Sequence, residues 1–314
     1  MSVSLEDVQT ALERIKRYVH RTPLERHQSL NDLSGAELWF KSENKQKCGA
    51  FKARGAHHAL TQLTPEQLAR GVATHSSGNH GAALALAARQ FGAQAFVVMP
   101  SNAPAPKRQA TLAYGATVID CEPTLAAREA ALKACVERTG AVFVPPYDHP
   151  DIIAGQGTLA LEMLEQNPNL DAILVPVGGG GMLAGVSLAV KALRPDIKVI
   201  GVEPLGADDA KRSFLTGQHV RQHQPDTIAD GLRTTLGTLN FALIRDYTDD
   251  IVTVTDAQIT AAMKVFMVRA KALVEPSGIV GLAAVMADPS RFAKQQVGIV
   301  ISGGNVDLEH PVWL

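Results

Sequence analysis

The sequence predicts an α/β protein with two domains, each a parallel β-sheet covered by helices. Three observations support this prediction. Short apolar runs typical of buried strands alternate with longer helical runs along most of the 314 residues. Three glycine-bearing turns each follow such an apolar run, as expected where a parallel strand ends. The composition, 46% hydrophobic and 19% charged, is typical of a globular chain of one or two domains.

Composition and charge exclude several classes of protein. The net charge of −1 gives no electrostatic reason to expect binding to nucleic acid or to an anionic membrane. The longest apolar runs, such as residues 82–88, are too short to span a bilayer, and the polar, acidic N-terminus does not resemble a secretory signal. Cys48, Cys121 and Cys135 have no metal-ligand spacing and cannot all pair, which favours reduced cysteines in a cytoplasmic protein.

The first 70 residues contain two clear helix signals. Apolar residues recur at helical spacing within residues 4–19, with Ser4 as a capping residue. This helix must end before Pro23, because the residue preceding a proline is pushed out of the α region. A strand is predicted at 37–41. Residues 64–67, Thr-Pro-Glu-Gln, combine a cap, a proline at the first helical position and a glutamine that reaches back.

The rest of the chain alternates regularly between the two kinds of element. Strands are predicted at 72–74, 95–99, 117–120 and 142–144, and the helices between them at 81–91, 106–114 and 125–138. A second series has strands at 172–177, 198–202 and 297–301, with a helix that ends at residue 193. This order is typical of parallel sheets whose crossover connections are helical.

One lysine lies in an unusual stretch, Gly49 to Ala56. Lys52 follows Phe51 and precedes small residues, so it is expected to lose part of its hydration. Desolvation lowers the pKa of an amine and frees it for Schiff-base chemistry, and the glycines let the backbone pass close to a bound ring. Taken alone, the stretch is more typical of a solvated lysine at a helix start.

The glycine turns give the lysine a context. They lie in residues 74–81, 177–182 and 301–305, each after a predicted strand, and ligands of parallel sheets bind beyond such strand ends. Gly178 to Gly181 would present backbone N–H groups at a helix N-terminus, which is a cradle for an anion such as a phosphate. The turn is not a Walker loop, because no Gly-Lys-Ser/Thr follows it. We therefore expect one small anionic cofactor in a crevice between the domains.

Two functions of other classes stay open at this point. Gly179-x-Gly181-x-x-Ala184, with Glu203 ending the next predicted strand, partly matches a dinucleotide-binding fingerprint and would suit an oxidoreductase. That alternative leaves Lys52 and residues 76–80 without a role. The second open function is that of a non-catalytic protein that binds an amino acid or a cofactor, since a fold alone does not confer activity.

These motifs, in this order, resemble those of the fold-type-II pyridoxal-phosphate enzymes, within which they are most similar to the branch of serine racemases and serine/threonine dehydratases. The resemblance runs from residues 21–24 (Arg-Thr-Pro-Leu) to 302–307 (Ser-Gly-Gly-Asn-Val-Asp), nearly the whole chain. It implies a fold like that of the tryptophan synthase β subunit. The large, cofactor-binding domain would comprise 1–70 plus 149–314 and the small domain 71–148. It also implies a homodimer.

The resemblance assigns the cofactor, pyridoxal 5'-phosphate, to particular residues. Lys52 would form the Schiff base and remove the α-proton of the substrate, and Phe51 would pack against the ring. Asn79 can donate an amide hydrogen bond to the 3-oxygen of the ring. The phosphate would lie on Gly178, Gly179, Gly180 and Gly181, followed by Met182.

Ser302 would contact the pyridine nitrogen, and its residue type is informative. Many pyridoxal enzymes place a carboxylate there, which keeps the nitrogen protonated and the ring an electron sink. A hydroxyl does not hold that proton. The resemblance therefore favours β-elimination or reprotonation over transamination.

The substrate residues that the resemblance implies are Ser76, Ser77, Asn79, His80, Arg128 and Thr234. The turn at 76–80 would bind the α-carboxylate at a helix start, and Arg128 could pair with a second carboxylate. We expect a dehydratase (ammonia-lyase) that converts L-serine, L-threonine or 3-hydroxyaspartate to a 2-oxo acid and ammonia. The alternative is a racemase of serine or aspartate, with Lys52 and Ser77 as bases on opposite faces.

Two further sites follow from the resemblance. Taken alone, Glu203 and Asp209 are typical partners of a helix N-terminus. The family match instead implies that they bind Mg²⁺, Ca²⁺ or Mn²⁺ together with the backbone carbonyl of Ala207.

The second site is the nucleotide site of the family. Cys48 and Ala82 depart from the family near this site, although other residues match positions there, namely Lys47, Tyr114, Lys271 and Asn305. These departures argue against activation by ATP.

Overall fold

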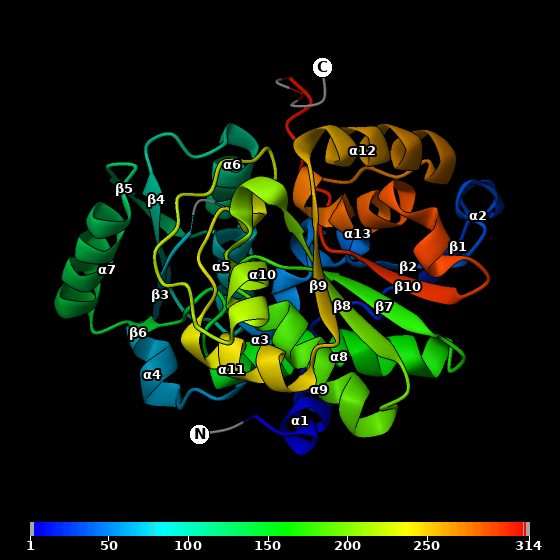
Figure 1. The fold of residues 1–314 in the computed structure, drawn as a ribbon. Helices are drawn as coiled ribbons and strands as arrows, with labels where there is room; N and C mark the ends of the chain where they lie inside the picture. The colour runs from blue at the N-terminus through cyan, green and yellow to red at the C-terminus, as the bar shows by residue number, and fades with distance from the viewer. Residues whose placement is uncertain (1–2, 77, 310, 312–314) are drawn as a thin grey trace.

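The computed structural model describes residues 3–76, 78–309 and 311, and it contains two β-sheets flanked by helices (Figure 1). The six-stranded sheet has the order β1-β2-β10-β7-β8-β9. Its strands are β1 (Leu24–Arg26), β2 (Glu37–Ser42), β7 (Ala172–Pro176), β8 (Lys198–Pro204), β9 (Asp250–Val254) and β10 (Gln296–Ile301). All neighbours pair in parallel except β1, which runs antiparallel to β2. The predicted α/β class is confirmed.

The second sheet is a separate, fully parallel one of four strands in the order β5-β4-β3-β6. Its strands are β3 (Val72–His75), β4 (Ala95–Pro100), β5 (Thr117–Cys121) and β6 (Val142–Phe143). All four fall within the segment 71–148, which we call the small unit; the remaining residues form the large unit. The division of the chain into two domains at these boundaries stays a prediction.

The helices of the small unit lie close to their predicted bounds, whereas the segment before it contains one helix, Gln28–Ser34, that was not predicted. The helices of this segment and of the small unit are α1 (Leu5–Ile15), α2 (Gln28–Ser34), α3 (Lys52–Thr61), α4 (Pro65–Arg70), α5 (Asn79–Gln90), α6 (Ala105–Ala113) and α7 (Leu125–Thr139). Both predicted caps are present, because Ser4 accepts from the backbone of Asp7 and Thr64 accepts from that of Gln67. Helix α5 begins two residues earlier than predicted, at Asn79 itself.

The remaining helices cover the six-stranded sheet. They are α8 (Pro150–Gln166), α9 (Gly181–Leu193), α10 (Asp209–Thr216), α11 (Thr238–Tyr247), α12 (Asp256–Ala270) and α13 (Pro276–Ala287). In Figure 1, α12 and α13 lie on one face of this sheet and α8 and α9 on the other. Throughout the described ranges, each helix is too short or too polar to cross a membrane.

Strand β7 shows why the large sheet must be covered on both faces. Ile173 and Val175 join the apolar cluster under α8 and α9, whereas Ala172 and Leu174 join the one under α12 and α13. Successive side chains of a strand point to opposite faces, so a strand that is apolar throughout needs a helical layer on each side. The whole of β7 is buried.

Glycines bring the backbones of α3, α8 and α9 into direct contact. A Cβ atom on Gly155 of α8 would lie 2.7 Å from the Cα of Gly55 on α3, and one on Gly157 would lie 2.8 Å from the carbonyl oxygen of Gly185 on α9. A Cβ on Gly185 would overlap the carbonyl oxygen of Ile153. Because α3 begins at Lys52 and α9 begins at the tetraglycine turn, this packing determines where both helix starts lie.

A buried ionic cluster attaches α3 to the large sheet. The Arg54 guanidinium donates two 2.8 Å hydrogen bonds to the carboxylate of Glu43 and two of the same length to that of Glu162 on α8. Lys41 donates to Glu162 at 2.6 Å. Burial lowers the pKa of Arg54, but Glu43 and Glu162 together raise it by more than burial lowers it. The net pKa of Arg54 therefore lies above its ordinary value. Two cations thus balance two anions, which buried charges require.

Candidate active site

Lys52 is held at the first position of α3 with its amine among protein groups. Its Nζ donates to the carbonyl oxygen of Pro146 at 2.6 Å and lies 5.1 Å from the ring centroid of Phe51 and 6.0 Å from that of Tyr147. Part of the residue stays accessible, but burial of the amine lowers its pKa to about 8. A sizeable fraction of Lys52 is therefore a neutral nucleophile near neutral pH.

The tetraglycine turn leaves the start of α9 free for an anion. Gly180 has a φ of 90°, and no side chain caps the helix that begins at Gly181. A Cβ on Gly179 would overlap the ring of Tyr147, and one on Gly180 would lie 2.5 Å from Leu236. Only glycine fits here, and the uncapped N–H groups with the helix dipole form the cradle predicted for a phosphate. Met182 contributes its side chain to the hydrophobic core.

The third glycine turn lies directly beside the lysine stretch. The carbonyl oxygen of Ser302 accepts from the N–H of Phe51 at 3.0 Å, and the carbonyl oxygen of Gly49 accepts from Gly304 at 3.0 Å. The Ser302 hydroxyl is buried and donates to the carbonyl oxygen of Ser277 at 3.4 Å. Hydrogen bonds of that length are weak. The hydroxyl can therefore exchange this partner for a ring nitrogen.

Asn79 joins the small unit to this turn. Its Oδ1 accepts from Asn305 at 2.9 Å, and its Nδ2 donates to Glu275 at 2.6 Å. A flipped amide would turn its oxygen towards a carboxylate, so the orientation is unambiguous. An amide nitrogen carries two hydrogens, and these two contacts use one of them. The other is available for a ligand in the site.

The turn before α5 contributes Ser76, and the first turn of α5 contributes His80. The hydroxyl of Ser76 accepts from the N–H of Gly78 at 3.2 Å, and the Nε2 of His80 lies 3.2 Å from the carbonyl oxygen of Val144. Burial, and then the positive charge of Lys52, lower the pKa of His80 to about 3. His80 is therefore neutral, and its buried Nδ1 has no partner among the described residues. Ser77 lies outside the residues that the structure describes.

The two remaining predicted substrate residues differ in their placement. The hydroxyls of Thr234 and Tyr147 lie 3.0 Å apart, which brings Thr234 next to the ring that covers Gly179. Arg128, on α7, donates its Nε to the carbonyl oxygen of Thr124 at 3.4 Å. Burial lowers the pKa of His75 at the end of β3, and the nearby charge of Arg128 lowers it further. Arg128 thus lies near the site, with its side chain held on its own helix.

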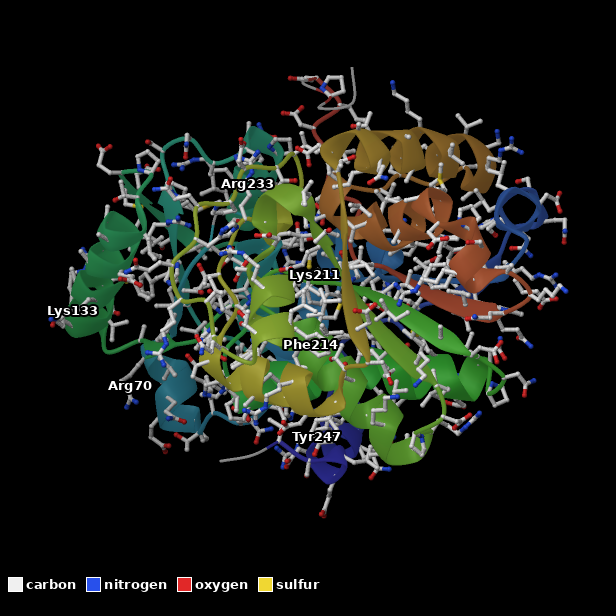
Figure 2. The ribbon with its side chains drawn as sticks, in the orientation of Figure 1. Arg70, Lys133, Lys211, Phe214, Arg233 and Tyr247 are labelled. Carbon is white, nitrogen blue, oxygen red and sulfur yellow. The ribbon has the colours of Figure 1, made fainter. Side chains whose placement is uncertain are left out.

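The predicted metal ligands are brought together at the end of β8. Glu203 accepts from backbone N–H groups at the start of α10, including that of Lys211 at 2.8 Å. Figure 2 labels Lys211 and, further along the same helix, Phe214. One Asp209 oxygen accepts from Leu236 at 2.7 Å, whereas the other is buried with no partner among the residues that the structure describes. Burial raises the pKa of Glu203, and the charge of Asp209 raises it further. The described ranges contain no group of three or more His, Cys, Asp or Glu side chains that could together hold a metal ion.

Sequence reasoning missed several residues of the site. Tyr147 follows two prolines in a loop, and no periodicity marks it. Lys107 on α6 forms ion pairs with Asp230 and with Glu275, the latter at 3.5 Å between Nζ and Oε2. Glu275 precedes a helix-starting proline, which is the one local signal that it carries.

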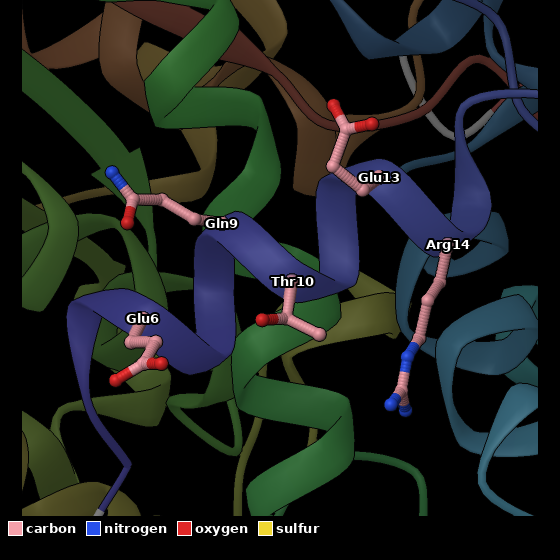
Figure 3. A pocket seen from close by; sticks show the side chains of 5 residues that line it. All are labelled: Glu6, Gln9, Thr10, Glu13 and Arg14. Carbon is pink, nitrogen blue, oxygen red and sulfur yellow. The ribbon is translucent and has the colours of Figure 1, made fainter.

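A hollow of 480 Å³ lies away from this site, on the outer surface of α1 (Figure 3). It is lined by Glu6, Gln9, Thr10, Glu13 and Arg14. All five come from one exposed helix, and the hollow is open to solvent. An enzyme site needs convergent groups from several elements, and such groups surround Lys52 instead.

Comparison with known proteins identifies the family. Residues 15–303 match the family model described as pyridoxal-phosphate dependent enzyme. The chain belongs to this family. It is 47% identical over 312 residues to a serine racemase of Dictyostelium discoideum, covering 98% of this chain and 96% of the relative. It is 44% identical over 308 residues to a beta-hydroxyaspartate dehydratase of Paracoccus denitrificans, covering 98% of each.

Solved structures agree with this assignment. Maize serine racemase superposes with a TM-score of 0.96 at 44% identity, covering 98% of this chain and 95% of that one. The predicted family and fold are confirmed, and family membership decides against the dinucleotide-dependent oxidoreductase. The residues present also fit the coenzyme, because they include a desolvated lysine, an uncapped glycine helix start and an amide with a spare hydrogen.

The lowered pKa of Lys52 is testable in the coenzyme-free protein. We expect an amine-specific reagent to modify Lys52 at a rate that rises with pH and reaches half its maximum near pH 8, because only the neutral amine reacts. Peptide mass spectrometry measures the extent at each pH. A midpoint near pH ~10, the ordinary range for lysine, would show that the amine is solvated.

Proposed function

We propose that this protein is a pyridoxal-phosphate-dependent ammonia-lyase that converts a small β-hydroxy amino acid to a 2-oxo acid and ammonia. L-Serine, L-threonine and 3-hydroxyaspartate are the candidate substrates. The observation that carries the proposal is that the low-pKa amine of Lys52 and the uncapped tetraglycine turn lie on the same aromatic ring, that of Tyr147. A beta-hydroxyaspartate dehydratase and an L-threo-3-hydroxyaspartate ammonia-lyase from Pseudomonas, both above 40% identical, support it.

The bound coenzyme would supply an electron sink for the substrate's α-carbon. Lys52 would remove the α-proton, since an amine with a pKa of about 8 is a competent base near neutral pH. The glycine turn would hold the phosphate, and the spare hydrogen of Asn79 would reach the 3-oxygen. Ser302 would contact the ring nitrogen without a negative charge, which favours loss of the β-hydroxyl over transamination.

The substrate would lie between the start of α5 and the Tyr147–Thr234 pair. The N–H groups before α5 and the hydroxyl of Ser76 suit an α-carboxylate, because a helix N-terminus favours an anion. Arg128 lies close enough to influence both His75 and Tyr147, and it would provide the cation for a second carboxylate. That pairing favours 3-hydroxyaspartate among the candidates.

Racemisation of serine or aspartate is the second candidate function. Inversion needs a proton donor on the face opposite Lys52, and the sequence places the hydroxyl of Ser77 in the loop before α5. Serine racemases of Dictyostelium, at 47% identity, and of Arabidopsis thaliana, at 48%, support this candidate. The two reactions share the first proton transfer, so one protein can perform both.

A divalent cation, Mg²⁺, Ca²⁺ or Mn²⁺, would bind at Glu203, Asp209 and the carbonyl of Ala207. Two buried carboxylates repel one another, and Asp209 keeps an unpartnered oxygen. A hard cation with water ligands satisfies both features. We also infer a cytoplasmic homodimer that ATP does not activate, which rests on the family resemblance and on Cys48 and Ala82.

Replacing Lys52 tests the proposed chemistry directly. Borohydride reduction of the coenzyme-loaded protein should attach the coenzyme permanently to the peptide that contains residue 52. Lys52→Ala should lose this label and release no ammonia from a panel of serine, threonine and 3-hydroxyaspartate. Lys45→Ala removes an exposed lysine that pairs with Glu25, and it should behave like the wild type. Attachment at another lysine would refute the assignment.

Ser77→Ala separates the two candidate reactions. It should abolish the formation of D-serine from L-serine while sparing the release of ammonia from L-serine, because elimination needs only the lysine face. Chiral chromatography and ammonia detection measure the two rates on one sample. Equal loss of both reactions would contradict this division of roles.

A further inference from the structure

A cluster of three charged groups lies between the two units. Lys107 on α6 forms ion pairs with Asp230, at the start of a short 3-10 helix (Asp230–Leu232), and with Glu275, just before α13. The side chains of Lys107 and Glu275 are 5% and 2% exposed. Lys107 belongs to the small unit, and both of its partners belong to the large unit. Every ion pair of the cluster therefore crosses from one unit to the other.

Glu275 also reaches into the candidate active site. Its Oε1 accepts from the Nδ2 of Asn79 at 2.6 Å, and its backbone N–H donates to the carbonyl oxygen of Gly303 at 3.1 Å. A Cβ on Gly303 would overlap the carboxylate, so the glycine turn beside Lys52 leaves the space that Glu275 occupies. The carboxylate of Glu275 thus contacts both Lys107 and the amide of Asn79, which we assign to the coenzyme.

The hydrogen-bonding capacity of Asn79 shows what Glu275 does there. Asn305 donates to the amide oxygen, and Glu275 accepts one of the two amide hydrogens. With these two partners the amide plane has one orientation, and the second hydrogen is directed away from Glu275. Without the carboxylate, the amide can turn over and present its oxygen instead of its hydrogen.

Lys107 holds Glu275 in place through their buried ion pair. Burial raises the pKa of Glu275 above its ordinary value, and Lys107 limits this rise whereas Asp230 adds to it. The stem of Lys107 passes beside the turn before α5, where a Cβ on Gly78 would lie 3.6 Å from its Cδ. The same lysine therefore lies beside the residue that precedes Asn79 and pairs with the carboxylate that contacts Asn79.

We propose that Glu275 and Lys107 are positioning residues that couple the closure of the small unit onto the large unit to the orientation of Asn79. Glu275 directs the free amide hydrogen of Asn79 towards the coenzyme's 3-oxygen, and Lys107 sets this geometry only when the two units are in contact. The inference rests on the proposed function in one respect, the assignment of Asn79 to the coenzyme. The contact between the units is independent of it.

The experiment compares Lys107→Met and Glu275→Gln with Arg108→Met. Arg108 is the neighbour of Lys107 on α6 and pairs with Asp120, also in the small unit, at 2.6 Å, so its loss removes an ion pair that does not cross between units. The first measurement is hydrogen exchange in the coenzyme-free protein. Amides of α6 and of the first turn of α5 should exchange at least about tenfold faster in Lys107→Met, and at the wild-type rate in Arg108→Met.

The second measurement is made on the coenzyme-loaded protein. The absorption spectrum of the bound coenzyme reports the hydrogen bond to its 3-oxygen. Lys107→Met and Glu275→Gln should shift that spectrum and weaken the coenzyme's Kd by about tenfold or more, whereas Arg108→Met should change neither. Lys107→Arg keeps the positive charge, so its coenzyme spectrum and Kd should be close to those of the wild type. A general structural defect would not show this rescue.

The outcomes separate the parts of the proposal. Wild-type exchange in Lys107→Met would overturn the coupling of the units. A wild-type spectrum and Kd in Glu275→Gln would overturn the role of Glu275 in orienting Asn79. If Glu275→Gln does not fold, the spectrum of Lys107→Met decides the second point. Failure of the wild type to bind the coenzyme would refute the proposed function, while the exchange measurement would still test the contact between the units.

Discussion

The contact between the backbones of α3, α8 and α9 is the constraint on which the site depends. The lysine begins α3 and the anion cradle begins α9, and α8 lies between them. Gly55, Gly155 and Gly185 leave no side chain that could adjust this spacing. Arg54 adds a second attachment, because its two carboxylate partners come from the short helix that follows β2 and from α8. Interiors packed at this density transmit any displacement, so the distance from amine to phosphate cradle is a property of the fold.

The site itself contains little net charge, and its charged groups lie one layer away. Lys52 has a lowered pKa, His80 is neutral, and Asn79 and Ser302 offer neutral hydrogen bonds. Two buried clusters of charges lie around it, one centred on Arg54 and one on Lys107. Such an arrangement places neutral donors at the reacting centre and uses ion pairs to hold the elements that carry them.

Much of the fold followed from local pattern. The parallel strands, the glycine turns and Lys52 were predicted because apolar runs and glycines act through the backbone, within a few residues. Strands β1 and β9 were missed, since β1 has three residues and β9 alternates less clearly. Glu275 and Lys107 lie 168 positions apart in sequence, and no local pattern records that they meet. Met182 was predicted as a cofactor residue, and because its side chain lies in the core, only its backbone is left for that role.

The affinity of coenzyme for Gly185→Ala tests the central claim most directly. Alanine favours a helix by about 1 kcal/mol over glycine, but its Cβ would overlap the carbonyl oxygen of Ile153 and push α9 away from α8. We expect the Kd for pyridoxal phosphate to rise at least about tenfold, equivalent to ~1.4 kcal/mol, while Ala192→Ser, at an exposed position of the same helix, leaves it unchanged. A wild-type Kd in a folded Gly185→Ala protein would contradict the claim that helix packing sets the coenzyme site.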